Sequence, residues 1–146
     1  MPIAVGTGER CVGAARFPLS GQSAAVDSIV DLDAAVREIE RRADQWGSAG
    51  LVVGVVTWRD QGDSLPPTLK TDRSQVIDPD SIRVSVRKEE QEGEVVLFRG
   101  GWCDFVYWSG RPDDEPVQDA PGYPDEMTVQ GFAGVLDRLA ASSNSA

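Results

Sequence analysis

The stretch from Val95 to Trp108, VVLFRGGWCDFVYW, constrains the fold more than any other part of the chain. Two apolar, aromatic-rich runs flank Arg99-Gly100-Gly101, and a short Gly-containing segment between two such runs is typical of a β-hairpin. The stretch also holds two of the four Trp residues. We therefore predict that this hairpin forms the centre of a sheet around which the rest of the chain is organised.

The composition fits a single globular domain. A chain of 146 residues with 40% hydrophobic and 26% charged residues can build a core without disulfides or metal. Cys11 and Cys103 are too few for a disulfide framework, so we expect both to be reduced thiols. No apolar window approaches the length of a membrane span, and Glu9-Arg10 interrupt the place where a signal peptide needs its apolar run. We expect a cytoplasmic protein.

The net charge of −10 is concentrated in one region. Eleven Asp and Glu lie between Glu89 and Glu126, against only Arg99 and Arg111. Such a balance argues against nucleic-acid binding, which needs Lys and Arg for phosphate contacts. Two interpretations stay open: a solvated surface that keeps the protein soluble, or a negative patch that steers it toward a basic partner.

Helical periodicity appears twice. One apolar stripe follows Asp31, a plausible N-cap, and the second follows Thr128. The first contains Leu32, Ala35, Val36, Ile39, Ala43 and Trp46; the second contains Val129, Phe132, Val135, Leu136 and Leu139. Both stripes are expected to face the core.

Strand patterns fill the space between the helices. The apolar, β-branched run from Leu51 to Trp58 predicts a central strand, and the alternation over 82–86 predicts a half-exposed one. The strand over 82–86 and those predicted over 94–99 and 102–109 make an antiparallel meander. Residues 60–80 and the Pro-rich acidic segment 110–125 are predicted to be long loops.

This order of elements predicts an α+β domain with a mostly antiparallel sheet of four to five strands and two helices packed on one face. We assign the domain to residues 29–141. Residues 1–28 are expected to form a loosely attached arm or an edge strand, and residues 142–146 a disordered tail.

Candidates for catalysis are few. The chain has no His, which removes His-based triads and His-based metal sites. Cys103 lies between Trp102 and Asp104, where a neighbouring acid disfavours the thiolate. The carboxylates cluster in a Pro-rich loop without the spacing of a glycosidase pair or a calcium loop. We therefore predict no enzymatic activity, no cofactor and no metal.

The hairpin aromatics are better candidates for binding a partner. Trp102, Asp104, Val106 and Trp108 share one face of their strand, and Cys103, Phe105 and Tyr107 share the other. Either both faces are covered, with Trp108 under the acidic loop, or one aromatic face is exposed beside a rim of acids, as in a binding hot spot. The predicted partner-binding residues are Asp104, Tyr107, Trp108, Asp113, Asp114, Glu115, Asp119 and Tyr123.

A family resemblance adds a specific hypothesis. The helix containing DLDAAVREIE, the meander ending in GGWCDFVYW, the acidic Pro-rich loop and the helix containing FAGVLDRLA together resemble the small α+β immunity proteins of bacterial polymorphic toxins, over about Asp31 to Ala140. The group found beside deaminase and nuclease toxins is the most similar. The resemblance implies a non-enzymatic protein that binds and neutralises a cognate, basic, nucleic-acid-targeting toxin.

Two other functions remain open. One is a small ligand-binding domain or enzyme with a pocket between the 60–80 loop and the sheet, near Trp58, Arg59 and Arg83. The other is a homo-oligomeric structural protein. For the immunity hypothesis we expect a monomer or weak dimer that contacts neither nucleic acid nor membrane.

Overall fold

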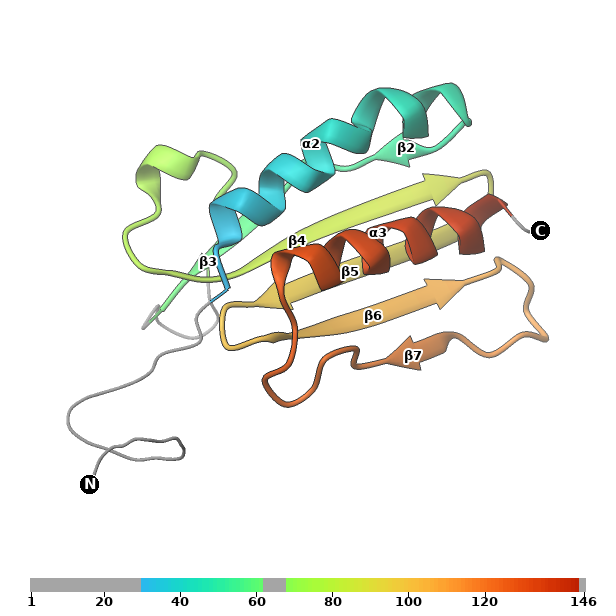
Figure 1. The fold of residues 1–146 in the computed structure, drawn as a ribbon. Coiled ribbons are helices and arrows are strands. Elements are labelled where there is room, and N and C mark those ends of the chain that lie inside the picture. Colours follow the sequence, from blue (N-terminus) through green and yellow to red (C-terminus); the bar gives the residue numbers. More distant parts are fainter. Residues whose placement is uncertain (1–29, 62–67, 145–146) are drawn as a thin grey trace.

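The computed structural model describes residues 30–61 and 68–144, as two helices and six strands in the order α2, β2–β7, α3 (Figure 1). The elements are α2 (Leu32–Ser48), β2 (Val52–Val53), β3 (Thr57–Asp60), a 3-10 turn (Arg73–Gln75), β4 (Pro79–Lys88), β5 (Gln91–Phe98), β6 (Trp102–Trp108), β7 (Val117–Asp119) and α3 (Val129–Asn144). The predicted arm at 1–28 lies outside the described residues, as do 62–67 and 145–146.

All strand pairs are antiparallel, and the sheet has the order β2-β4-β5-β6-β7, with β3 also paired to β4. Both helices lie on the same face of this sheet, α2 toward the β2 edge and α3 across β4, β5 and β6 (Figure 1). The predicted α+β class and the placement of both helices on one face are confirmed. Neither helix in the described part combines the length and the apolar character that crossing a membrane requires.

The core lies between the helices and this covered face. Each helix begins where the sequence predicts: Asp31 Oδ1 accepts a hydrogen bond from the Ala34 amide, and Thr128 Oγ1 accepts one from the Gly131 amide, both at 3.0 Å. The predicted stripes are largely buried, but Ala43 is exposed. The helices pack on β4, β5 and β6 through a set of buried side chains: Ile82, Val84, Val86, Val95, Leu97, Cys103 and Phe105.

The meander has the predicted order, and two turns fix its register. Glu89-Glu90 forms a two-residue turn that pairs Lys88 with Gln91. The second turn runs from Arg99 to Gly101 and pairs Phe98 with Trp102. Because side chains alternate along a strand, this register sends one set of residues to the helices and the other to the opposite face.

The strand predicted over Leu51–Trp58 is not central. It lies at the sheet edge and is divided into β2 and β3, which pair with the two ends of β4. Val52 and Val55 are 57% and 72% exposed. The apolar run suggested a central strand covered on both faces, or on one face with a neighbour close by, but a strand's place in a sheet depends on long-range pairing, which the run does not encode.

Two further boundaries differ from the expectation. The acidic segment contains a short strand, β7, which extends the sheet beyond β6. Helix α3 continues to Asn144, three residues into the segment expected to be a tail. Ser143 is buried, and its hydroxyl donates a hydrogen bond to the Leu139 carbonyl.

Asp60 fixes the return from β3 to β4. Its Oδ1 accepts hydrogen bonds from the amides of Ile77 and Asp78, and its Oδ2 lies 3.1 Å from Lys70 Nζ. Burial alone would raise the pKa of Asp60, but these hydrogen bonds and the ammonium group bring the pKa below its ordinary value. The carboxylate therefore holds the two ends of the segment between Gln61 and Asp78 together.

Replacing Asp60 with Asn should lower Tm at neutral pH, because the amide cannot pair with Lys70. A lowered native pKa contributes stability that is present above the unfolded pKa of about 3.9 and is lost as pH falls through the native value. The difference in Tm between wild type and Asp60→Asn should therefore shrink in acid, as followed by circular dichroism. Asp44→Asn, at an exposed position of α2, is the control. Equal Tm values for wild type and Asp60→Asn at neutral pH would contradict this role.

Candidate functional site

The face of the sheet opposite the helices, called here the open face, carries the main candidate site. Its side chains come from alternate positions of the three long strands. Across it, Arg87 faces Glu92 and Glu92 faces Trp108; further along, Ser85 faces Glu94 and Glu94 faces Val106. The remaining open-face positions of these strands include Arg83, Val96, Phe98, Trp102 and Asp104.

One end of the open face is aromatic. Phe98 and Trp102 stack at 4.3 Å between ring centroids, and Tyr123 meets Trp102 edge-on at 5.4 Å. Such pairs stabilise by about 0.5–1.5 kcal/mol beyond the area that they bury. Tyr123 nevertheless remains 65% exposed. We call Phe98, Trp102 and Tyr123 the aromatic cluster.

Backbone contacts hold Tyr123 in place. The Cys103 amide donates to the Pro121 carbonyl at 2.9 Å, and the Met127 amide donates to the Gly101 carbonyl at 2.8 Å. The segment 121–127 is thus tied to the start of β6. Gly101 has φ 107°, and a Cβ there would lie 3.0 Å from the Asp125 backbone. The 121–127 segment therefore packs against Gly101, a position where only glycine fits.

The acidic loop, residues 110–116, lies beside the other end of β6. Its residues from 111 onward are all exposed. The Trp108 indole Nε1 donates to the Asp114 carbonyl at 3.3 Å, and the Ser109 hydroxyl donates to the Asp114 carboxylate at 2.7 Å. At Gly110, with φ 87°, a Cβ would lie 2.6 Å from the Glu90 carbonyl oxygen. The loop therefore starts from a fixed position next to the β4–β5 turn.

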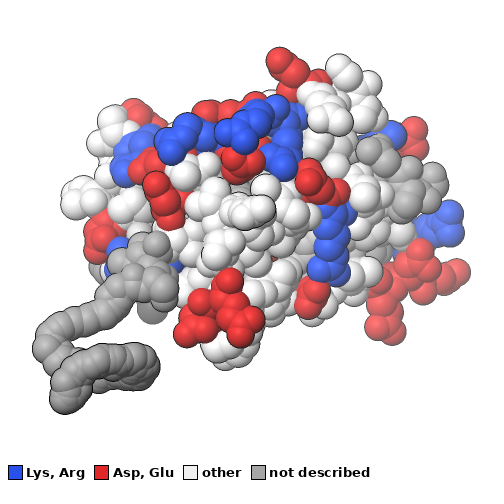
Figure 2. Space-filling view, viewed as in Figure 1, with Lys and Arg blue, Asp and Glu red and all other residues white. Residues whose placement is uncertain are grey.

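Most acids of this region form no ion pair within the part of the chain that the structure describes. Of the eleven Asp and Glu between 89 and 126, Glu94 pairs with Arg83 and Asp119 pairs with Arg138. The other nine form no ion pair with a Lys or Arg of the described chain. The helix-covered side differs, since Lys and Arg gather over α2 there (Figure 2). Arg41 and Arg42 of α2 both pair with Glu38.

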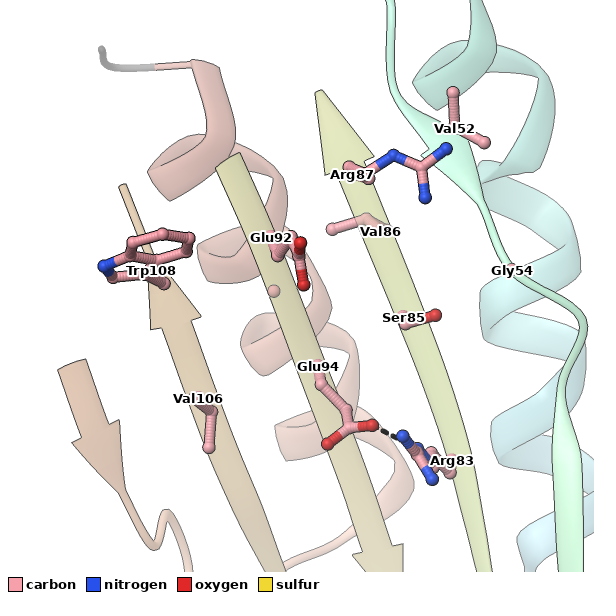
Figure 3. Close-up of a pocket in the computed structure, with 11 residues that line it drawn as sticks. Val52, Gly54, Arg83, Ser85, Val86, Arg87, Glu92, Glu94, Val106 and Trp108 are labelled. Carbon is pink, nitrogen blue, oxygen red and sulfur yellow. Dashed lines mark ion pairs between the residues drawn. The ribbon is translucent and has the colours of Figure 1, made fainter. Parts of the chain in front are cut away.

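A groove of about 420 Å³ crosses the open face near Trp108 (Figure 3). Val106 and Trp108 line it from β6, Glu92 and Glu94 from β5, and Arg83, Ser85 and Arg87 from β4; Val52 and Gly54 complete the β2 side. Figure 3 shows that the Arg87 side chain extends toward Val52, whereas the Arg83 side chain reaches Glu94. The groove therefore has an apolar wall on β6 and an acidic wall on β5.

The predicted partner-binding residues fall into two groups. Asp104 and Trp108 lie on the open face, Tyr123 adds to the aromatic cluster, and Asp113, Asp114 and Glu115 lie on the adjoining acidic loop. Tyr107 and Asp119 lie on the helix-covered side. The Tyr107 hydroxyl donates to Gln91 Oε1, and Asp119 pairs with Arg138 of α3 at 2.7 Å. The hydrogen bond from Arg138 holds the pKa of Asp119 below its ordinary value.

Sequence reasoning did not single out Glu92, Arg87 or Phe98. Each is an ordinary residue of an amphipathic strand, and its role comes from its cross-strand neighbours. The sequence predicted a strand only from residue 94, whereas a two-residue turn at Glu89-Glu90 brings Glu92 into β5, opposite Arg87.

A second hollow, also of about 420 Å³, lies on the helix side between α2 and β3, with Trp58, Thr71 and Arg73 among its lining residues. The Arg73 guanidinium lies 4.9 Å from the Trp58 ring centroid and binds both carboxylate oxygens of Asp33, at 2.7 and 3.1 Å. A hollow therefore exists near Trp58, as the ligand-pocket alternative requires, but two of its charged lining residues, Arg73 and Asp33, already pair with each other. Arg83 lines the groove on the open face instead.

In residues 30–61 and 68–144, no three or more His, Cys, Asp or Glu side chains are grouped to hold a metal ion. Comparison with known proteins gives no further lead: no family model, no curated protein and no solved structure matches this chain.

Cys103 is a structural residue on the covered face. It is fully buried in the core, and burial raises the pKa of its thiol to about 12. A thiol that stays protonated is neither a nucleophile nor a metal ligand at neutral pH. We therefore assign Cys103 to packing.

This assignment predicts a protected thiol. In a Cys11→Ser variant, which leaves Cys103 as the only thiol, reaction with a disulfide reagent at about pH 8 should be about a thousandfold slower in native than in denatured protein. One equivalent of thiol should react after unfolding. Rapid labelling of the native Cys11→Ser protein would show that Cys103 is accessible and ionisable.

Proposed function

We propose that this protein is a non-enzymatic binding module that attaches to a basic protein and neutralises it, as an immunity protein does for a nucleic-acid-targeting bacterial toxin. The observation that carries the proposal is the open face, where a partly exposed aromatic cluster lies beside carboxylates that form no ion pair with described residues. The toxin partner itself rests on the family resemblance in the sequence.

The aromatic cluster supports binding of a protein surface. Trp and Tyr are enriched at the centres of interfaces because one rigid side chain buries a large area and also offers a polar group. Trp102 is already packed against Phe98, and Tyr123 is held by a turn tied to β6. Binding would therefore immobilise few additional side-chain bonds.

The distribution of charge supports a basic partner. The acidic loop, Asp104 and the 125–126 turn place negative charge on or beside the open face. Charge complementarity of this kind raises association rates and excludes acidic competitors. A toxin that acts on nucleic acid carries positive charge on its substrate-binding surface, so an acidic inhibitor can cover that surface.

The partner can be tested directly with the product of the neighbouring gene. We expect a one-to-one complex in gel filtration and loss of the toxin's activity on nucleic acid. Tyr123→Ala should weaken the complex by about 2 kcal/mol or more, because it removes an exposed anchor. Tyr107→Phe, on the helix-covered side, should leave affinity unchanged. A neighbour that forms no complex, or one that remains active when bound, would contradict the proposal.

The acidic loop should act mainly on the association rate. The double variant Asp113→Lys/Glu115→Lys should slow association by about tenfold at low ionic strength and flatten its salt dependence. Asp114 is kept because its carboxylate accepts the Ser109 hydroxyl. Glu40→Lys/Asp44→Lys on α2 makes the same change in net charge away from the open face, and it should alter the rate by about twofold or less. Equal rates in the two variants would show that the loop contributes only to net charge.

A further inference from the structure

We infer that the groove near Trp108 is a subsite for an arginine side chain, which a basic partner lays over β5 and β6 on the open face. The inference rests on the proposed binding function and names the chemistry that one part of the open face recognises. The inference is carried by an apolar wall, an acidic wall, small residues on the far side of the groove and a carboxylate that forms no ion pair with a described Lys or Arg.

The β6 wall suits the aliphatic part of an arginine. Val106 and Trp108 are two residues apart, so both side chains lie on the open face and line the groove. The hydrogen bond from Trp108 Nε1 to the Asp114 carbonyl fixes the edge of the indole. Arginine stems pack along apolar surface, and guanidinium groups bind tryptophan more strongly than other aromatic side chains.

The β5 wall suits the guanidinium. Glu92 and Glu94 flank Gly93 and lie on the same face, about 7 Å apart along the strand. Arg83 pairs with one oxygen of Glu94, whereas Glu92 forms no ion pair with a described Lys or Arg. A planar group with five N–H donors can reach both carboxylates, which a single ammonium cannot do as well.

The side of the groove away from β6 carries small residues. Ser85 lies opposite Glu94, and the neighbouring Gly54 amide donates to the Ser85 carbonyl at 2.8 Å. A Cβ on Gly54 would lie 2.6 Å from the Ser85 hydroxyl oxygen. The backbones at Gly54 and Ser85 therefore meet without a large side chain on the side of the groove away from β6 (Figure 3).

Two arginines also line the groove, so an anionic occupant is the competing possibility. Arg83 is already paired with Glu94, and Arg87 extends toward Val52, away from the apolar wall. A carboxylate bound to Arg87 would lack the contacts with Val106 and Trp108. Glu92, which forms no ion pair with a described Lys or Arg, lies opposite Trp108 of the apolar wall, and this arrangement favours a cation.

The test uses N-acetyl-triarginine amide as the probe, with the matching trilysine and triglutamate peptides, followed by NMR of the tryptophan indole N–H signals. Triarginine should shift the Trp108 signal and leave Trp102, in the aromatic cluster, unmoved. Trilysine should bind more weakly, and triglutamate should not bind.

Variants separate the groove from general attraction to an acidic protein. Glu92→Gln, at an exposed strand position, should weaken triarginine binding by about tenfold, because it removes a charge-assisted pair. Trp108→Leu should weaken binding by a smaller factor, read from the chemical shifts of the groove amides. Glu40→Gln/Asp44→Asn is the control, since it removes charge at exposed positions of α2 on the helix-covered side and should change affinity by about twofold or less.

Several outcomes would overturn the inference: triglutamate binding in place of triarginine, a shift at Trp102 with Trp108 unmoved, or equal affinity in wild type and Glu92→Gln. They can be told apart from failure of the proposed function. A tight partner complex unaffected by Glu92→Gln would remove the arginine subsite and leave the binding function intact. Triarginine binding at Trp108 without any complex with the neighbouring gene product would support the arginine subsite and contradict the proposed function.

Discussion

The register of the β4–β5–β6 meander is the constraint on which the rest of the structure depends. With Lys88 paired to Gln91 and Phe98 paired to Trp102, Val84, Val95 and Phe105 all face the helices. A slip of one residue between two strands would turn one strand's apolar set to solvent and bury its charged set. Because burial of one face stabilises the sheet so strongly, the two turns determine the composition of the open face as well as that of the core.

Gly93 connects the two faces. A Cβ on Gly93 would lie 2.5 Å from Leu139 Cδ1, so the missing side chain lets α3 pack close to β5. The adjacent Glu92 and Glu94 point to the other face, where they form the acidic wall of the groove. The helix position and the placement of the two carboxylates are therefore consequences of one stretch of strand. A change at Gly93 would disturb both together, and for that reason binding tests belong at Glu92.

The sequence was informative where structure is local. The alternation over 82–86 and 102–108, the caps Asp31 and Thr128 and the turn residues predicted the meander, both helices and the sides that the β6 aromatics occupy. It was uninformative where pairing is long-range. Val117–Asp119 is a strand only because β6 lies beside it, and Leu51–Trp58 is an edge only because β4 pairs with β5 on its other side. Residues on or next to four strands line the groove, so predicting it required the register of these strands and not only their hydrophobic patterns.

The two edges explain why we propose the open face, rather than an edge, as the surface for a partner. At one edge the strand is broken between β2 and β3, and at the other β7 has only three residues, with Asp119 held by Arg138. Short and interrupted edges offer few backbone groups for pairing with another chain, which protects a sheet from edge-to-edge association. The open face has the opposite character: it is continuous over three long strands, with aromatic residues at one end and a groove at the other. Recognition on such a surface depends on side chains, so its specificity can be changed one residue at a time without altering the fold.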